Sequence, residues 1–247
     1  MSAPTIVIVP GAWQNPIVWD RFRSIVEKTG HPTPVHVALP TIGGTQPPLP
    51  GLAEDVAAVR SVLVPLIEKQ GQEVVLLCHS SGGVVGSNSV EGLDLGSREA
   101  AGKAGGVIRI VFLAAFMLPK GQSLLGLLGG TPLPWMKVED DRVSGDPDMF
   151  PQIGFNDLPP EEQARWSKEA TYTSAALFTT PSSFEPWNNE VPCSYIFCAN
   201  DNALPLPFQQ SMARQLGPEP RTATLNSGHC PFLSKPNELL EALKTVC

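Results

Sequence analysis

Short apolar runs alternate with amphipathic segments along most of the 247-residue chain. The apolar runs predict buried strands, and apolar residues at helical spacing predict helices. The predicted strands span 5–9, 35–39, 74–78, 107–115, 193–199 and 221–225, and the predicted helices span 17–29, 52–69 and 237–246. This alternation is typical of an α/β fold, in which a mostly parallel sheet is flanked by helices.

One strand-to-helix turn in this pattern presents a serine. The apolar run 74–78 leads directly into His-Ser-Ser-Gly-Gly at 79–83 and then into a helix-like segment. Small residues at such a turn let strand and helix pass closely and hold the central serine at a sharp corner, with its hydroxyl above the sheet. The pattern is that of the nucleophile elbow G-x-S-x-G, with the small, apolar Cys78 in place of the first glycine. Ser80 is therefore the candidate nucleophile, and His79 is interpreted as a packing residue.

Two later segments offer an acid and a base. The apolar run 193–199 is followed by Asp201, which places a carboxylate at the carboxyl end of a strand, where open parallel sheets hold their chemistry. His229 follows the predicted strand 221–225, and no other histidine comes after Asp201. Ser80, Asp201 and His229 are thus the candidate catalytic residues.

The chemistry of acyl transfer needs each of these residue types. A serine hydroxyl is a weak nucleophile at neutral pH, so a neutral imidazole must take its proton, while a carboxylate fixes the tautomer of the imidazole. The developing oxyanion needs hydrogen-bond donors, and one of them is the backbone N–H of the residue after the nucleophile, here Ser81. A second donor is expected from the loop after the first strand, Pro-Gly-Ala-Trp at 10–13.

With these motifs in order, the chain resembles the α/β-hydrolase superfamily, and within it the small-esterase branch that includes methylesterases and hydroxynitrile lyases. The resemblance runs over nearly the whole chain and implies that the backbone N–H of Ala12 is the second oxyanion donor. It also implies that no cofactor is required. Members of the branch have histidine where Pro10 stands, so the first loop of this chain departs from the family pattern.

The strand–helix alternation stops between residues 116 and 190, a stretch rich in Pro, Gly, Met and Trp. A loop of that length is uncommon unless it forms a lid or a binding element. Helix is predicted there only over 160–167 and 174–178. We expect a single α/β-hydrolase domain over 1–247, with a core formed by 1–115 and 191–247 and an inserted cap, 116–190, over the catalytic face.

Apolar side chains dominate the predicted cap, which favours a small to medium, largely apolar small-molecule substrate. Trp135 and Met136 of the cap and Trp13 beside the oxyanion loop are the candidate substrate contacts.

Composition narrows the possible partners and the location. The net charge is −7, with 24 acidic and 17 basic residues and no basic block, so we expect neither a nucleic-acid partner nor a membrane partner. The N-terminus lacks a leader pattern, which favours a cytoplasmic protein. Five scattered cysteines without C-x-x-C pairs predict reduced thiols and no metal site. The resemblance leaves a homodimer open.

Several functions fit these residues. The favoured one is a serine hydrolase that cleaves an ester or lactone through an acyl-enzyme. The alternatives are a lyase, or an enzyme that cleaves or forms carbon–carbon bonds with the same triad, and a ligand-binding or receptor role. The hydroxynitrile lyases of the branch have Thr in the first loop and Lys after the catalytic histidine, and Gly11 and Cys230 at those places disfavour that chemistry.

Overall fold

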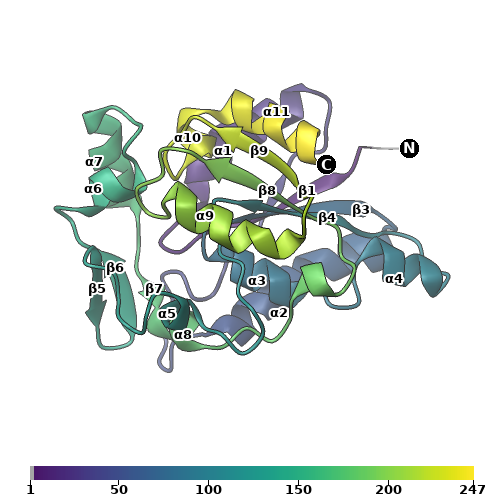
Figure 1. Ribbon diagram of the computed structural model, residues 1–247, viewed down its shortest axis with the longest axis horizontal. Helices are drawn as coiled ribbons and strands as arrows, with labels where there is room; N and C mark the ends of the chain where they lie inside the picture. The colour runs from purple at the N-terminus through teal and green to yellow at the C-terminus, as the bar shows by residue number, and fades with distance from the viewer. Residues whose placement is uncertain (1–2) are drawn as a thin grey trace.

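Six parallel strands form the central sheet in a computed structural model, which describes residues 3–247 (Figure 1). In sheet order the strands are β2 (Val35–His36), β1 (Thr5–Val9), β3 (Glu73–His79), β4 (Gly106–Leu113), β8 (Cys193–Cys198) and β9 (Arg221–Leu225). Every neighbouring pair runs parallel, so all carboxyl ends meet at one edge. The predicted α/β fold is confirmed.

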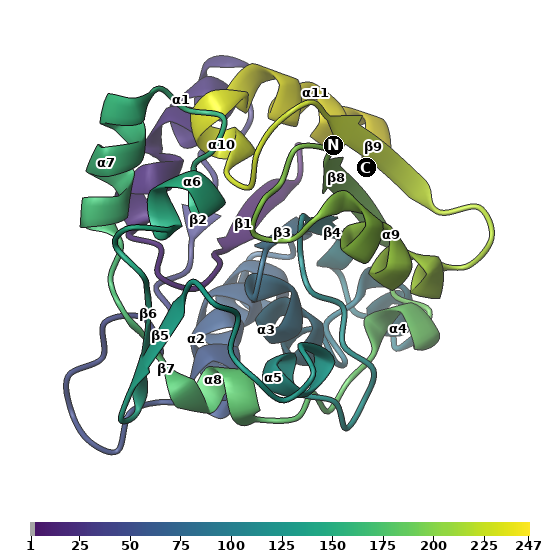
Figure 2. The same cartoon turned by 60° about the vertical axis from the view of Figure 1, so that its left-hand side comes forward.

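Helices cover both faces of this sheet. Helices α1 and α11 lie on one face, and α2 and α3 lie on the other (Figures 1 and 2). The elements of the sheet layers are η1 (Pro16–Trp19), α1 (Asp20–Lys28), α2 (Leu52–Val64), η2 (Pro65–Lys69), α3 (Gly82–Ser89), α4 (Leu95–Ala100), α9 (Leu206–Ala213), η4 (Arg214–Leu216), α10 (Pro231–Ser234) and α11 (Pro236–Val246). Leucines of α11 are buried against the sheet, as its spacing predicts.

Between β4 and β8 the chain leaves the sheet. This inserted segment, residues 114–192, gathers on the left-hand side of Figure 1, and Figure 2 brings it forward. It holds a second, antiparallel sheet with the order β5-β6-β7. Its elements are α5 (Leu124–Leu127), β5 (Met136–Glu139), β6 (Arg142–Gly145), α6 (Phe150–Gly154), α7 (Pro160–Glu169), β7 (Thr173–Ser174), α8 (Ala175–Thr179) and η3 (Pro186–Asn188).

Several predicted boundaries are wrong. The strand predicted over 35–39 ends at His36, because β2 is an edge strand and the chain turns away toward the Pro- and Gly-rich stretch 40–51. Helix α4 lies in the Gly-rich stretch 91–106, where no helix is predicted. Its N-cap is Asp94, whose Oδ1 accepts the N–H of Ser97 at 2.7 Å, and six residues are too few to show helical periodicity.

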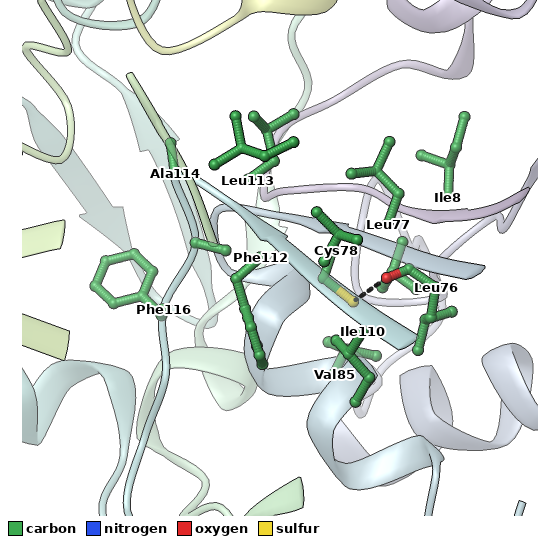
Figure 3. Packing of buried hydrophobic residues seen from close by; sticks show 14 of the residues in the cluster. Ile8, Leu76, Leu77, Cys78, Val85, Ile110, Phe112, Leu113, Ala114 and Phe116 are labelled. Atoms are coloured by element: carbon green, nitrogen blue, oxygen red, sulfur yellow. Dashed lines mark hydrogen bonds between the residues drawn. The ribbon is translucent and has the colours of Figure 1, made fainter. Parts of the chain in front are cut away.

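Cys78, which replaces the first glycine of the elbow pattern, is accommodated by a glycine elsewhere. Its fully buried side chain lies among Leu76, Val85 and Ile110 (Figure 3). A Cβ built on Gly86 of α3 would overlap the Sγ of Cys78. The side chain of Cys78 therefore occupies the space that a Cβ at position 86 of the facing helix would need.

This packing predicts a compensating pair of substitutions. Gly86→Ala is expected to destabilise the fold by about 1–3 kcal/mol, because the new methyl group overpacks the strand–helix contact. Adding Cys78→Gly removes the overlapping sulfur, so the two changes should couple favourably by at least about 0.5 kcal/mol. Urea denaturation of the two single variants and the double variant measures the coupling.

Gly96→Ala is the matched control, since a Cβ there meets only Asp94 Oδ1, at 3.6 Å. It should leave the free energy of unfolding unchanged or raise it by up to about 1 kcal/mol. Additive effects of Gly86→Ala and Cys78→Gly would show that the two residues do not share this space.

Candidate active site

Ser80 lies where β3 ends and α3 begins, beside the end of β1. Strand β1 has β2 on one side and β3 on the other, so the crevice between β1 and β3 is the switch point at which open α/β sheets bind ligands. Ser80 has φ 53°, in the left-handed region that non-glycine residues rarely adopt. The backbone at Ser80 thus has the strained geometry expected of a nucleophile elbow.

Glycines around Ser80 permit this close packing. A Cβ on Gly82 would overlap the backbone carbonyl oxygens of Val9 and Pro10, and a Cβ on Gly11 would lie 2.7 Å from the Cβ of Ser80. The loop after β1 therefore lies directly against the elbow, as the predicted oxyanion arrangement requires.

Asp201 and His229 meet at the carboxyl ends of β8 and β9. His229 Nδ1 lies 2.7 Å from Asp201 Oδ2, and both residues are buried. An ionised carboxylate can only accept, so a neutral imidazole at His229 carries its hydrogen on Nδ1 and keeps a free lone pair on Nε2. The other oxygen, Asp201 Oδ1, accepts the backbone N–H groups of Ala203 and Leu204 at 2.8 and 2.9 Å, which fixes the carboxylate in place.

Ser80 and His229 line the same cavity, but no hydrogen bond joins the Ser80 hydroxyl to the imidazole in this conformation. Catalytic hydrogen bonds are often long in the absence of substrate and tighten in the reactive complex. The structure thus brings the three predicted residues to one site with the acid–base contact made and the base–nucleophile contact open.

The two candidate oxyanion donors also lie together. The backbone N–H of Ala12 donates to the side-chain Oγ of Ser81 over 2.8 Å, and both residues line the cavity. The Ser81 hydroxyl is thus engaged with the loop after β1. For Ala12 to act on a substrate, its N–H must exchange Ser81 Oγ for the carbonyl oxygen of that substrate.

The cavity above Ser80 is a narrow, apolar slot of about 50 Å³. The predicted contacts Trp13, Trp135 and Met136 all line it, and no lysine or arginine of residues 3–247 does. Most of its wall comes from the inserted segment. Its aromatic lining consists of Trp13, Phe116, Trp135, Phe150, Phe155, Trp166, Phe178 and Phe232.

Trp13 connects the oxyanion loop to the inserted segment. Its ring stacks on Phe178 with centroids 5.8 Å apart and meets Trp135 edge-on at 5.4 Å. Its indole N–H donates to the backbone oxygen of Val143, and its backbone N–H donates to Thr173 Oγ1, each over 2.8 Å. A change in the position of the inserted segment would therefore move the loop that carries Ala12.

Two further polar contacts join the inserted segment to the catalytic loops. Asp157 Oδ2 accepts the backbone N–H of Gly228, next to His229, over 2.7 Å. The Asn156 side chain donates to the backbone oxygen of Asn200, next to Asp201, over 2.8 Å. Sequence reasoning missed both residues, because they lie in a stretch without strong periodicity.

Gln209 of α9 is another missed residue. It is fully buried, its Oε1 accepts the N–H of Cys198 at 3.0 Å, and its Nε2 lies 3.3 Å from Asp201 Oδ2. Gln209 thus braces the strand end that carries the acid. A buried glutamine inside a short helix gives no signal in the hydrophobic pattern, which is why neither α9 nor its role was predicted.

His79 is fully buried next to the candidate base. Its Nδ1 lies 2.8 Å from Gln14 Nε2, and its Nε2 lies 2.8 Å from the backbone oxygen of His229. Burial, followed by the neighbouring His229, lowers the pKa of His79 well below its usual range. His79 is therefore a neutral, hydrogen-bonded residue, as its packing role predicts.

The cysteines near the site are poor nucleophiles. Burial raises the thiol pKa of Cys78, Cys198 and Cys230 well above the ordinary value. Only a thiolate attacks readily, so these groups stay as inert thiols at neutral pH. Cys230 nevertheless lines the cavity, where a reagent bound to it would obstruct the site.

Residues 3–247 contain neither a metal-binding cluster nor a membrane-spanning helix. Within this range, no cluster of three or more His, Cys, Asp and Glu side chains is arranged to hold a metal ion. Over the same residues, no helix has the length and apolar character needed to cross a membrane.

A family model described as the alpha/beta hydrolase family matches residues 6–242. The chain belongs to this family. Alpha/beta hydrolase nvfD of Aspergillus novofumigatus is 30% identical over 252 residues, which cover 100% of this chain and 97% of that protein. Methylesterase 7 of Arabidopsis thaliana is 26% identical over 265 residues, covering 97% and 93%.

Solved structures share the fold of this alpha/beta hydrolase. Polyneuridine aldehyde esterase matches with a TM-score of 0.75 and 20% identity over 98% of both chains. A pyrethroid hydrolase from Sphingobium faniae JZ-2 matches with a TM-score of 0.74 and 22% identity, covering 98% of this chain and 96% of that one. The predicted resemblance to the small-esterase branch and the predicted hydrolase class are confirmed, and the lyase alternative is not favoured.

Proposed function

We propose that this alpha/beta hydrolase cleaves carboxylic esters or lactones through a covalent intermediate on Ser80. The observation that carries the proposal is the 2.7 Å contact between His229 Nδ1 and Asp201 Oδ2, made beside the cavity that Ser80 lines. In the neutral imidazole, that contact places the hydrogen on Nδ1, so Nε2 is free to accept the proton of Ser80.

The reaction then proceeds in two halves. Ser80 Oγ attacks the acyl carbon while its proton passes to His229 Nε2, and the backbone N–H groups of Ala12 and Ser81 donate to the oxyanion. The tetrahedral intermediate collapses, the bond to the leaving oxygen breaks, and His229 protonates that oxygen. Water next attacks the acyl-enzyme, giving its proton to His229, which returns it to Ser80 as the carboxylic acid leaves.

The substrate that suits this cavity is apolar and uncharged. The wall of the cavity is mostly aromatic and aliphatic, with Glu169 as its acidic side chain and no lysine or arginine among the described residues. A substrate carboxylate buried there would find neither of those cations to pair with. We propose that the inserted segment acts as a cap that desolvates the ester. Names among the relatives, such as methylesterase and pyrethroid hydrolase, agree with ester hydrolysis.

A pair of esters of equal length tests this function. We expect steady hydrolysis of p-nitrophenyl butyrate, and at least about tenfold lower kcat/KM for the p-nitrophenyl monoester of succinate, whose acyl group ends in a carboxylate. Release of p-nitrophenolate measures both. An acetate-to-octanoate series then gives the acyl length that the slot accepts.

Two outcomes would contradict this proposal. Equal rates for the butyrate and succinate esters would contradict the assignment of the apolar slot as the acyl site. The absence of turnover on the whole series and on simple lactones would contradict the hydrolase mechanism.

A further inference from the structure

Gln14 links the oxyanion loop to the candidate base through a chain of hydrogen bonds. Its Oε1 lies 3.1 Å from the backbone nitrogen of Gly11 and 3.2 Å from Trp19 Nε1. Its Nε2 lies 2.8 Å from Nδ1 of His79, whose Nε2 lies 2.8 Å from the backbone oxygen of His229. One glutamine thus connects the loop next to Ala12 with the residue that carries the base.

The direction of every hydrogen bond in this chain is fixed by chemistry. A backbone N–H and an indole N–H can only donate, so the Gln14 oxygen must face Gly11 and Trp19 and its amide nitrogen must face His79. A backbone oxygen can only accept, so His79 donates from Nε2 to His229. Nδ1 of His79 is then left as the acceptor of the Gln14 amide, which gives His79 the tautomer with its hydrogen on Nε2.

The surroundings of His79 make its charge state important. The centroids of the His79 and His229 rings lie 4.5 Å apart. The His79 ring also packs edge-on against the rings of Phe232 and Trp19. In the proposed mechanism His229 becomes positively charged when it takes the proton of Ser80. A second imidazolium at that distance, in a buried site, would oppose this charge strongly.

We infer that Gln14 is a positioning residue: by donating to Nδ1 it holds His79 in the neutral Nε2–H form, which anchors the His229 backbone without placing a cation beside it. The same side chain holds the backbone of Gly11, where the preceding Pro10 has no N–H to contribute. The inference rests on the proposed function, since it assigns Gln14 a part in proton transfer at His229.

Two substitutions of similar size separate this role from simple packing. Gln14→Glu keeps an oxygen for Gly11 and Trp19 but places a second oxygen against Nδ1 of His79, which favours a proton there and hence an imidazolium. Gln14→Leu loses all three hydrogen bonds yet leaves His79 neutral. A purely structural role predicts that leucine is the more harmful change.

We expect the opposite order for the hydrolysis of p-nitrophenyl butyrate. Gln14→Glu should lower kcat by about 10- to 100-fold with KM within about threefold of wild type, because proton transfer rather than substrate binding is impaired. Gln14→Leu should lower kcat less. Gln70→Glu, which makes the same charge change at an exposed residue before β3, at the far end of the sheet, is the control and should match wild type.

Nitrogen-15 NMR of histidine-labelled protein tests the tautomer independently of turnover, and replacement of His31 and His36 assigns the spectrum. We expect His79 to carry its proton on Nε2 alone in wild type and on both nitrogens in Gln14→Glu. A wild-type proton on Nδ1, or wild-type kcat in Gln14→Glu, would overturn the inference. If the wild-type chain hydrolyses no ester or lactone, the proposed function fails, and the NMR result still decides how Gln14 holds His79.

Discussion

Ser80→Ala should lower kcat/KM for p-nitrophenyl butyrate by about 10⁴- to 10⁶-fold, the loss expected when a nucleophile that acts together with a base is removed. Ser80 lies at the elbow with φ 53° and lines the apolar cavity that His229 also lines. We do not expect Ser81 to replace it, because the Ser81 hydroxyl already accepts the backbone N–H of Ala12 over 2.8 Å. Initial rates corrected for spontaneous hydrolysis measure the loss.

The folded state should be almost unchanged by Ser80→Ala, since alanine is smaller and the backbone of the elbow is held by its glycine neighbours. Thermal unfolding within about 2 °C of wild type, together with retained binding of a non-hydrolysable ester analogue, separates lost chemistry from lost structure. Turnover within tenfold of wild type would show that another residue carries the reaction.

Asp201→Asn should lower kcat by about 10⁴-fold while leaving the site in shape. One oxygen at this position accepts two backbone N–H groups, from Ala203 and Leu204, so the amide oxygen of asparagine must take that side. The amide nitrogen then faces His229 Nδ1 and donates to it. His229 is forced to carry its hydrogen on Nε2 and can no longer accept the proton of Ser80.

The matched control is Asp55→Asn, the same exchange at a buried aspartate of α2. The carboxylate of Asp55 accepts two hydrogen bonds from Thr41. This variant should keep wild-type kcat. Steady-state kinetics of both variants give kcat. A loss of kcat of less than tenfold in Asp201→Asn would mean that Asp201 does not fix the tautomer of His229.

The strands of the core could be predicted because buried parallel strands are continuous apolar runs. Runs such as 5–9, 74–78 and 107–115 contain few residues that fit any other structure, and the structure places strands there. The small sheet β5-β6-β7 could not be predicted. Its strands are two to four residues long, and β5 is mostly exposed, so its pattern has neither the length nor the apolar alternation of a half-buried strand.

The residues of the site likewise fall into a group that the sequence could predict and a group that it could not. Ser80, Asp201 and His229 could be located because each follows a predictable strand at the carboxyl edge of the sheet. Gln14, Gln209 and Asp157 could not, since their importance comes from hydrogen bonds between segments far apart in the chain, such as Asp157 with Gly228. A single polar residue in a loop or short helix carries no periodic signal of its contacts.

Intact-mass analysis after reaction with a fluorophosphonate tests the central claim most directly, because the reagent labels a serine activated by a neighbouring base whatever the natural substrate is. We predict one adduct on the wild-type chain, none on Ser80→Ala, and greatly slowed labelling of Asp201→Asn. An adduct on Ser80→Ala, or a wild-type chain that stays unlabelled while folded, would contradict the assignment of Ser80 as the nucleophile.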